Sequence, residues 1–359
     1  MARLDYIDHR ADPSAWAREL GCSDEAVALL LDSPFIDLHC DLEVPVRLFG
    51  WDPAKRHGPW KRVMPLFGHT DYPRLREAGM TGVVYDLATN VFRREPNRQV
   101  ITLANLERCQ RQIAAWPEDL AVARTRSEYD AAVAAGRTAF FLALQGGNAL
   151  SHDPTVLLGD VGQLIHRITL VHLKSSVLGG SNSPGQPENG ITDRGREFVK
   201  LCNQARILVD LAHAGKKTFW GALDAHDTLI PPIVSHVGMA GVRDLWRNID
   251  DDQARAIADR GGVIGIVYQG NFLADVPVGC ASKRSAIVDH LDHVIRVAGE
   301  QAAAIGTDYD GVITPPSDLT DITQHPLLVQ DMLDRGWSHA RIRGILGENY
   351  LRVVKEVRP

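Results

Sequence analysis

A histidine and an aspartate two residues apart end a short apolar stretch near the start of the chain. The stretch reads FIDLHCD over 35–41 and ends in His39 and Asp41. If it is a β-strand, residues at i and i+2 point to the same face, so both side chains project together from its end. An imidazole beside a carboxylate suits Zn²⁺ or a similar divalent ion. Such a pair is weak evidence alone, because His and Asp also meet as hydrogen-bonded partners.

Five further apolar stretches also end in polar side chains, and this recurrence strengthens the interpretation. Four strand-end histidines with two or three carboxylates are hard to explain by packing, so we predict a metal site at one shared mouth. The polar residues that follow these stretches are Gln145, His172, His213, His236, Asp308 and Asp310.

These residues need elements that bring distant parts of the chain together. Near-continuous apolar, β-branched runs separated by helical patterns indicate a parallel sheet covered by helices. Eight such runs predict an α/β fold, a (β/α)8 TIM barrel. A doubly wound sheet is the alternative, but the glycine-rich phosphate fingerprint expected after its first strand is missing. The predicted strands are 35–41, 81–89, 138–147, 168–172, 207–215, 231–238, 262–270 and 302–311.

The domain organisation follows from the same pattern. We expect a single barrel domain over 1–359, with N-terminal helices within 1–34 and C-terminal helices within 325–359. A long loop over 49–69 is predicted to cross the mouth. No internal repeat and no interdomain linker is evident.

Composition excludes several classes of function. A formal charge of −6 and the lack of a dense basic run argue against nucleic acid as the partner. Five scattered cysteines without CxxC spacing fit free thiols in a reducing compartment. The charged N-terminus is no signal peptide, and no apolar run is long enough to span a membrane. We therefore expect a cytoplasmic protein without a membrane partner.

Nine stretches of the chain, taken together, point to a known family. They are FIDLHCDLEVP, HTDYPRLREAGMTGVVY, LALQGGNAL, ITLVH, LVDLAHAG, IVSHVGM, RNIDDDQARAIADRGGVIGIVY, HLDHVIRVAGEQAAAIGTDYDGV and RGWSHARIRGILGENYLRVV. In order and spacing they resemble the membrane (renal) dipeptidases of the metal-dependent amidohydrolase superfamily, and the resemblance covers most of the chain.

The resemblance implies an amidohydrolase-like barrel that holds two Zn²⁺ ions. It places one ion on His39 and Asp41 and the other on His213 and His236. It implies a substrate that is a small molecule with a carboxylate, and a homodimer. The remaining implied roles are oxyanion stabilisation by His172, carboxylate binding by Arg247 and proton transfer by Asp308.

One position departs from the family at its metal centre. Gln145 stands where the family has a glutamate that bridges both ions. A carboxamide brings no charge and one good ligand oxygen, so one or both ions should be held more weakly. Asp86 near the mouth, where the family is usually aromatic, and Asn148 after the glycine pair put the substrate in question. We still count Asn148, with Arg247 and His172, among the predicted substrate contacts.

Four interpretations therefore remain open, of which three are functions. The first is a metal-dependent hydrolase that cleaves a dipeptide or related small amide with metal-activated water. The second is a drifted enzyme with one metal or none that acts on a non-peptide, biosynthetic substrate and need not hydrolyse it. The third is a binding protein without catalysis, which the presence of His172 and Asp308 disfavours. In the fourth, Gln145 is an engineered exchange that traps a complex.

Overall fold

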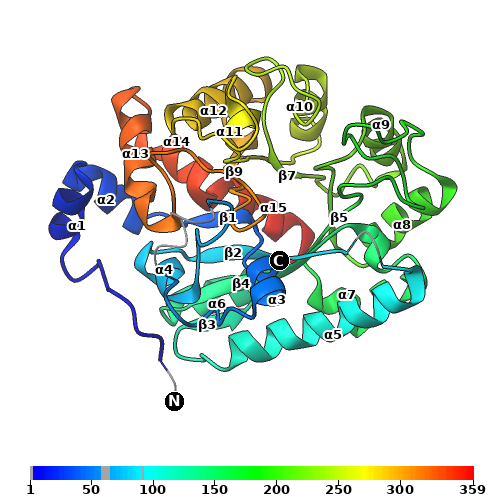
Figure 1. Ribbon diagram of the computed structural model, residues 1–359, viewed down its shortest axis with the longest axis horizontal. Coiled ribbons are helices and arrows are strands. Elements are labelled where there is room, and N and C mark those ends of the chain that lie inside the picture. Colours follow the sequence, from blue (N-terminus) through cyan, green and yellow to red (C-terminus); the bar gives the residue numbers. More distant parts are fainter. Residues whose placement is uncertain (1–2, 58–64, 91–92) are drawn as a thin grey trace.

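Parallel strands form a barrel at the centre of the molecule (Figure 1). The protein's structure is a computed structural model that describes residues 3–57, 65–90 and 93–359. Two sheets contribute, ordered β1-β2-β4-β5-β6 and β7-β8-β9, and every pairing is parallel. The barrel strands are β1 (Ile36–Cys40), β2 (Gly82–Ala88), β4 (Thr138–Gln145), β5 (Arg167–Thr169), β6 (Leu208–Asp210), β7 (Val234–Val237), β8 (Ile264–Ile266) and β9 (Ala303–Ile305).

Two short bridges join the sheets into one closed arrangement. Asp210 at the end of β6 pairs in parallel with Ile233, which precedes β7. Cys40 at the end of β1 pairs in parallel with Tyr309, beyond β9. The second bridge places the segment after β9 beside the end of β1, where the chemically promising residues were predicted. The (β/α)8 prediction is therefore confirmed.

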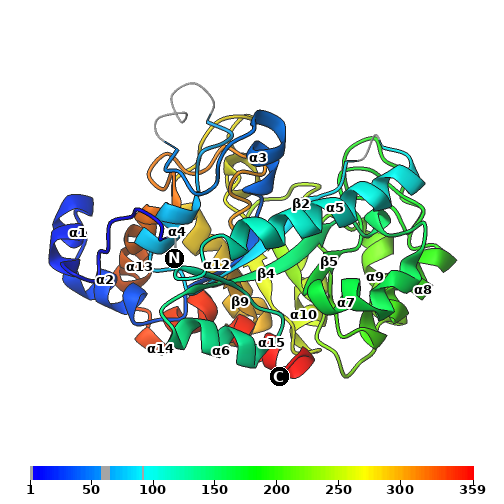
Figure 2. The same cartoon turned by 90° about the horizontal axis from the view of Figure 1, so that it is seen from below.

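Helices surround the barrel in both views (Figures 1 and 2). Asp12 and Ser23 cap the first two helices, because their side chains accept hydrogen bonds from backbone N–H groups of the first turn. Helix α2 packs against α13, so residues 24–31 lie beside residues 325–334. The helices are α1 (Pro13–Leu20), α2 (Asp24–Leu31), α3 (Glu43–Phe49), α4 (Tyr72–Glu77), α5 (Glu95–Ala114), α6 (Arg126–Ala134), α7 (Asp160–Leu164), α8 (Asp193–Gln204), α9 (Lys216–Ala225), α10 (Asp251–Ala258), α11 (Gly270–Leu273), α12 (Ser285–Ala298), α13 (His325–Asp334), α14 (His339–Arg343) and α15 (Asn349–Val357).

Strand alternation explains how apolar packing and polar chemistry share one barrel interior. Val84 on β2, Ala143 on β4 and Leu208 on β6 belong to one buried apolar cluster, which also takes in residues of α15. Two residues further along the same strands come Asp86, Gln145 and Asp210. Because residues at i and i+2 share a face, the polar side chains stand directly above that apolar layer. The apolar layer fills the interior below, and the polar layer lies above it, toward the mouth.

Two short elements differ from the sequence-based expectation. Strand β3 (Leu120–Val122) was not predicted; it pairs with the first half of β4, on the side where β5 pairs with the second half. Helix α3 fills the stretch just before the predicted 49–69 loop. Residues 58–64 of that loop lie outside the described residues.

Candidate metal centre

Six side chains meet at the mouth of the barrel, and we call them the strand-end cluster. His39 and His236 lie within β1 and β7, Asp41 follows β1, and Gln145 ends β4. His213 and Asp308 each stand three residues beyond a strand, β6 and β9. Parallel strands deliver their carboxyl ends to the same side of the barrel, which brings these distant residues together. The strand-end cluster comprises His39, Asp41, Gln145, His213, His236 and Asp308.

The amide of Gln145 lies among three imidazoles. Its Nε2 atom is 3.1 Å from Nε2 of His39, 3.4 Å from that of His213 and 3.5 Å from that of His236. The Nε2 atoms of His213 and His236 are themselves 2.9 Å apart. The residue that departs from the family pattern therefore occupies the centre of the cluster.

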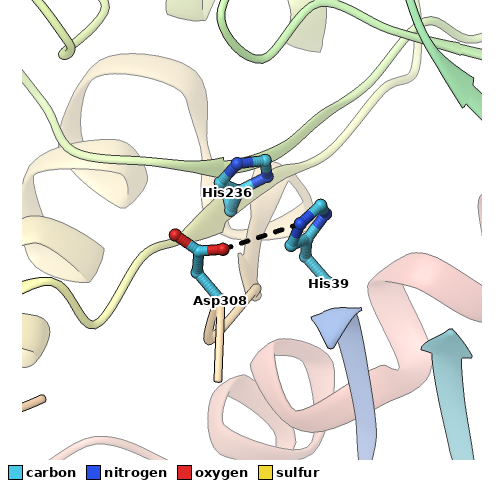
Figure 3. Close-up of side chains that lie close together, drawn as sticks. All are labelled: His39, His236 and Asp308. Carbon is cyan, nitrogen blue, oxygen red and sulfur yellow. Dashed lines mark ion pairs between the residues drawn. The ribbon is translucent and has the colours of Figure 1, made fainter. Parts of the chain in front are cut away.

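Two carboxylates approach the same cluster from the β1 and β9 sides. Nε2 of His39 is 3.4 Å from Asp41 Oδ2 and 3.6 Å from Asp308 Oδ1. His39, His236 and Asp308 each place one ligand atom within 4.8 Å of the others (Figure 3). The sequence paired His39 with Asp41 and His213 with His236; the structure brings both pairs, and Asp308, into one group.

The donor set fits a divalent cation. Burial lowers the pKa of His213 and of His236 well below the ordinary value, so both rings are neutral at pH 7. Asp41 Oδ1 and Gln145 Oε1 are buried without a hydrogen-bond partner among the described residues. Neutral imidazole nitrogens and unpaired oxygens are zinc ligands, and rotation of the Gln145 amide would turn Oε1 toward the imidazoles.

A buried network orients two of these imidazoles. Nδ1 of His39 lies 3.0 Å from Asp86 Oδ2, so Nδ1–H can donate there. Burial opposes protonation of His39, but the charges of Asp86 and Asp41 raise its pKa well above the ordinary value, so a cation would bind Nε2 by displacing its proton. Ser235 Oγ donates to Asp210 Oδ2 at 2.7 Å and lies 2.8 Å from His236 Nδ1, which orients that ring in the same way.

Arg167 joins the two halves of this network. Its guanidinium pairs with Asp86 and with Asp210, and all three side chains are buried. Sequence reasoning noted Asp86, but it missed Arg167 and Ser235. The available signal was Arg167 itself, a charged residue at the start of a buried strand. A buried arginine must be paired, so its position indicates acidic partners on neighbouring strands.

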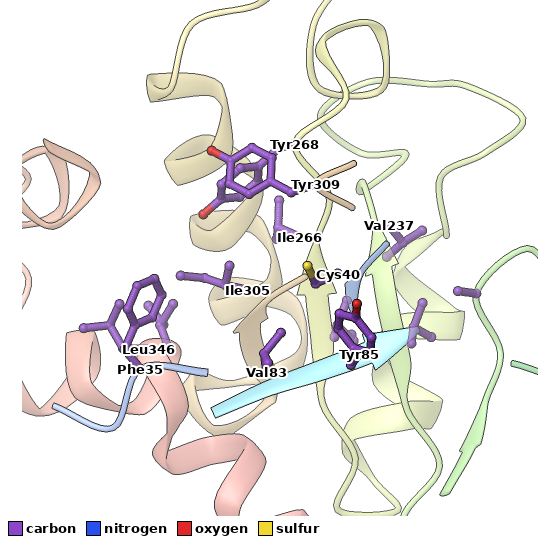
Figure 4. Packing of buried hydrophobic residues seen from close by; sticks show 14 of the residues in the cluster. Phe35, Cys40, Val83, Tyr85, Val237, Ile266, Tyr268, Ile305, Tyr309 and Leu346 are labelled. Atoms are coloured by element: carbon purple, nitrogen blue, oxygen red, sulfur yellow. The ribbon is translucent and has the colours of Figure 1, made fainter. Parts of the chain in front are cut away.

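Backbone strain marks two residues of the cluster. His213 and Asp308 have φ angles of 63° and 61°, a left-handed conformation that costs about 1–3 kcal/mol for such residues. Tyr309 secures the turn after β9: its ring packs edge-on against Tyr268 at 5.5 Å, and its hydroxyl donates to Leu319 O (Figure 4). The fold holds these side chains at the mouth despite their backbone cost.

Asp310 does not face the mouth, contrary to the prediction. Its carboxylate accepts hydrogen bonds from the backbone N–H groups of Gly68, His69 and Thr70. Nδ1 of His69 in turn accepts a hydrogen bond from the backbone N–H of Asp310 at 3.0 Å. The pair ties the 68–70 segment to the barrel.

Gly311 leaves room for the carboxylates of Asp41 and Asp308, which both lie against it. A Cβ atom there would lie 2.3 Å from Asp308 Oδ1 and 2.8 Å from Asp41 Oδ2. We expect Gly311→Ala to displace both and to weaken zinc binding by about 10–100-fold. Competition with a metallochromic chelator measures the affinity, and Gly159→Ala, where a Cβ meets nothing closer than 3.8 Å, is the control. Unchanged zinc affinity in Gly311→Ala would show that the carboxylates do not hold the ion.

A cavity of about 920 Å³ opens above the cluster. Gln145, His172, His213, Arg247 and Asp308 line it. Arg247 is buried and donates to His236 O at 2.9 Å, while its Nε and Nη1 have no hydrogen-bond partner among the described residues. A buried guanidinium with free donors suits an anionic ligand.

Asn148, predicted as a substrate contact, lies just after β4. Among the described residues it is absent from the cavity lining. After β4 the chain turns into a 3-10 helix (Gly147–Ala149), and the Asn148 carbonyl oxygen accepts from Arg98 and Ser151. The contact of its side chain with substrate stays a prediction.

The fold and the cluster define a class, the metal-dependent hydrolases built on an amidohydrolase-like barrel. A model of the membrane dipeptidase family (peptidase family M19) matches residues 23–359. The chain belongs to this family and is a metal-dependent hydrolase of the dipeptidase type. In the described part of the chain, no helix has the length and apolarity to cross a membrane.

Solved structures share the fold. Dipeptidase AC, a metallopeptidase of the same family, is 24% identical with a TM-score of 0.80, covering 90% of this chain and 98% of its own. A Rhodobacter sphaeroides metallopeptidase liganded with a phosphinate mimic of L-Ala-D-Ala is 23% identical, TM-score 0.80, covering 91% and 100%. The probable dipeptidase PvdM from Pseudomonas aeruginosa is 16% identical, TM-score 0.81, covering 95% and 99%.

Proposed function

We propose that the protein hydrolyses the amide bond of a dipeptide or a related small amide that carries a free carboxylate. One observation carries this proposal. Asp41, Gln145, His213 and Asp308 of the strand-end cluster line the same cavity as Arg247, whose Nε and Nη1 have no hydrogen-bond partner among the described residues. A substrate carboxylate held by Arg247 would place its amide bond toward the cluster, where the reaction takes place.

Zinc is the ion we propose for the cluster, in one or two sites. His39, Asp41, His213 and His236 would hold it, with the Gln145 oxygen as the weakest ligand. When bound, such an ion supplies a Lewis acid for the carbonyl and lowers the pKa of water.

His172 and Asp308 would act on the amide bond that is cleaved, one at its carbonyl oxygen and the other at its leaving amine. Burial and the positive charges of His39 and Arg247 lower the pKa of His172 to about 3, so a neutral ring can donate to the carbonyl oxygen. Burial raises the pKa of Asp308 to about 8, although the charge of His39 opposes this. Asp308 would take a proton from water and pass it to the leaving amine, because a cation bound beside it would lower that pKa.

Metal analysis and a dipeptide panel test the proposal together. We expect purified protein supplied with Zn²⁺, Mn²⁺ or Co²⁺ to release free amino acids from at least one dipeptide, and chelation to abolish the release. The panel includes both stereoisomers at each position. If the metal-loaded protein cleaves none of these dipeptides, the proposed reaction is wrong.

A second candidate function rests on Gln145. Its neutral amide occupies the centre of the cluster, where a carboxylate would balance two dications. This favours a drifted enzyme with one metal or none that acts on a non-peptide substrate. Bound metal in the protein as purified discriminates: two ions per chain favour the dipeptidase, and no bound metal favours the drifted enzyme.

Arg247 provides a test of how the substrate binds. Charge-assisted hydrogen bonds contribute about 1.5–3 kcal/mol, so we expect Arg247→Met to raise KM for a dipeptide by about 10–100-fold, with a smaller change in kcat. The same variant should no longer distinguish a dipeptide from its C-terminal amide.

Arg243→Met is the matched control, because Arg243 lies on the same loop but pairs with Asp275 at the surface. Zinc content is measured alongside to exclude loss of the cluster. A dipeptide preference over the amide that persists in Arg247→Met would assign carboxylate recognition to another residue.

A further inference from the structure

The cavity has a second cationic side besides Arg247. Arg47 from α3, Arg93 just before α5 and Arg108 within α5 line it, and we call these three residues the cationic wall. Helices α3 and α5 both contact β2, which brings the three residues to one side of the barrel mouth. The acidic residues in the lining are Asp41 and Asp308, both in the strand-end cluster.

The charge of this wall is only partly balanced. Arg108 pairs with buried Glu43. Arg47 donates to the carbonyl oxygen of Ala88 at 2.8 Å, a contact that carries no neutralising charge. The Arg93 side chain has no ion pair or hydrogen bond with the other described residues. Three guanidinium groups therefore face one carboxylate.

The three groups are close enough to affect one another. Burial lowers the pKa of Arg47; Glu43 opposes this, whereas Arg108 and Arg93 lower the pKa further. Gathering like charges at a cavity wall costs free energy, and a bound anion offsets that cost. Arginine is also the side chain best suited to bind a carboxylate through two parallel hydrogen bonds.

The cavity has room for a substrate that reaches the wall. Its volume of about 920 Å³ lies near the top of the range of about 300–1,000 Å³ typical of small-molecule sites. A dipeptide held between the strand-end cluster and Arg247 leaves part of this space for a side chain.

We propose that the cationic wall binds a second carboxylate of the substrate, so that the enzyme selects acidic dipeptides, with aspartate or glutamate at one position. This inference rests on the proposed function for the place of the first carboxylate at Arg247. Arg93 and Arg47 are the residues that would determine this specificity.

Binding of two isosteric probes tests the wall without requiring turnover. N-acetylglutamate and N-acetylglutamine differ by one carboxylate. In calorimetric titration of the zinc-loaded protein, we expect N-acetylglutamate to bind about tenfold more tightly, which corresponds to about 1.4 kcal/mol. The preference should shrink at high salt, because exposed charges are screened. Equal affinity for the two probes, or no binding of N-acetylglutamate, would overturn the proposal.

Variants assign the preference to the wall. In Arg47→Gln/Arg93→Gln we expect the affinity for N-acetylglutamate to exceed that for N-acetylglutamine by about twofold or less. Such a small preference is what a single exposed ion pair contributes. Arg94→Gln is the matched control, since Arg94 is exposed and does not line the cavity. It should keep the full preference. A preference that survives in the double variant would contradict the assignment.

Hydrolysis separates this inference from the proposed function. Glu-Ala, Gln-Ala, Ala-Glu and Ala-Gln are compared by kcat/KM. Faster cleavage of one acidic dipeptide than of its neutral isostere supports both proposals. Cleavage of all four at equal rates overturns the acidic subsite alone. The binding preference without cleavage of any dipeptide overturns the reaction and leaves the anion site in place.

Discussion

Gln145→Glu is expected to raise the number of tightly held divalent ions per chain and to tighten the weaker site by about a thousandfold. The Nε2 atom of Gln145 lies within 3.5 Å of the Nε2 atoms of three histidines, so a carboxylate there would lie beside all three imidazoles. Two unit charges about 4 Å apart interact by about 4 kcal/mol at an effective dielectric of 20, which is about a thousandfold in affinity.

Elemental analysis and calorimetric zinc titration measure this change without an activity assay. Gln163→Glu is the control, because it adds the same charge at an exposed position on α7. Its metal content should equal that of the unchanged protein. If Gln145→Glu binds no more zinc than Gln163→Glu, charge at the centre of the cluster does not limit metal binding.

The same variant discriminates between the two candidate functions. If Gln145→Glu gains metal and dipeptide hydrolysis together, this position alone separates the protein from a dipeptidase with a fuller metal site. If it gains metal but hydrolyses dipeptides no faster, the substrate cavity has changed as well. The second result would favour a non-peptide substrate.

Barrel strands were predictable because near-continuous apolar runs indicate strands that are buried on both faces of a sheet. The elements that were missed lack that signal. Strand β3 is three residues long and adds to β4 after a long helix. Helix α3 contains Pro45 and two valines, which have low helix propensity, so its sequence reads as loop. Tertiary contacts decide both elements.

Polar residues at strand ends were equally accessible to sequence reasoning, but their directions were not. Asp308 and Asp310 both follow β9, yet one faces the cluster and the other binds the 68–70 backbone. Both have left-handed φ angles, which sequence spacing does not reveal. The supporting network was hidden for another reason: Arg167 becomes meaningful only when β2 and β6 bring Asp86 and Asp210 to it.

Arg167→Met is expected to destabilise the protein more than other single exchanges of an arginine outside the site. The variant leaves Asp86 and Asp210 buried without their cation. Breaking a buried ion pair by removing one partner costs about 3–5 kcal/mol. Arg255→Met, at a surface pair with Asp252, should cost about 0–1 kcal/mol.

The loss should depend on pH, with a sign that follows from Asp210. Burial raises the pKa of this carboxyl, but Arg167, with Ser235 and Thr169, holds it below the ordinary value. Without Arg167, burial prevails and the pKa in the folded state rises above the unfolded value of about 3.9. The folded variant then binds more protons than the unfolded chain, so its stability falls as pH rises above 4.

Denaturant unfolding of chelator-treated protein at several pH values between 4 and 8 measures this effect apart from metal binding. The difference between Arg167→Met and the unchanged protein should be smallest at the acidic end and grow toward pH 8. Adding Asp210→Asn to Arg167→Met should recover part of the stability, because it removes one of the unpaired charges. A loss that is independent of pH, or no recovery in the double variant, would mean that Arg167 acts through packing and does not join the supports of His39 and His236 by its charge.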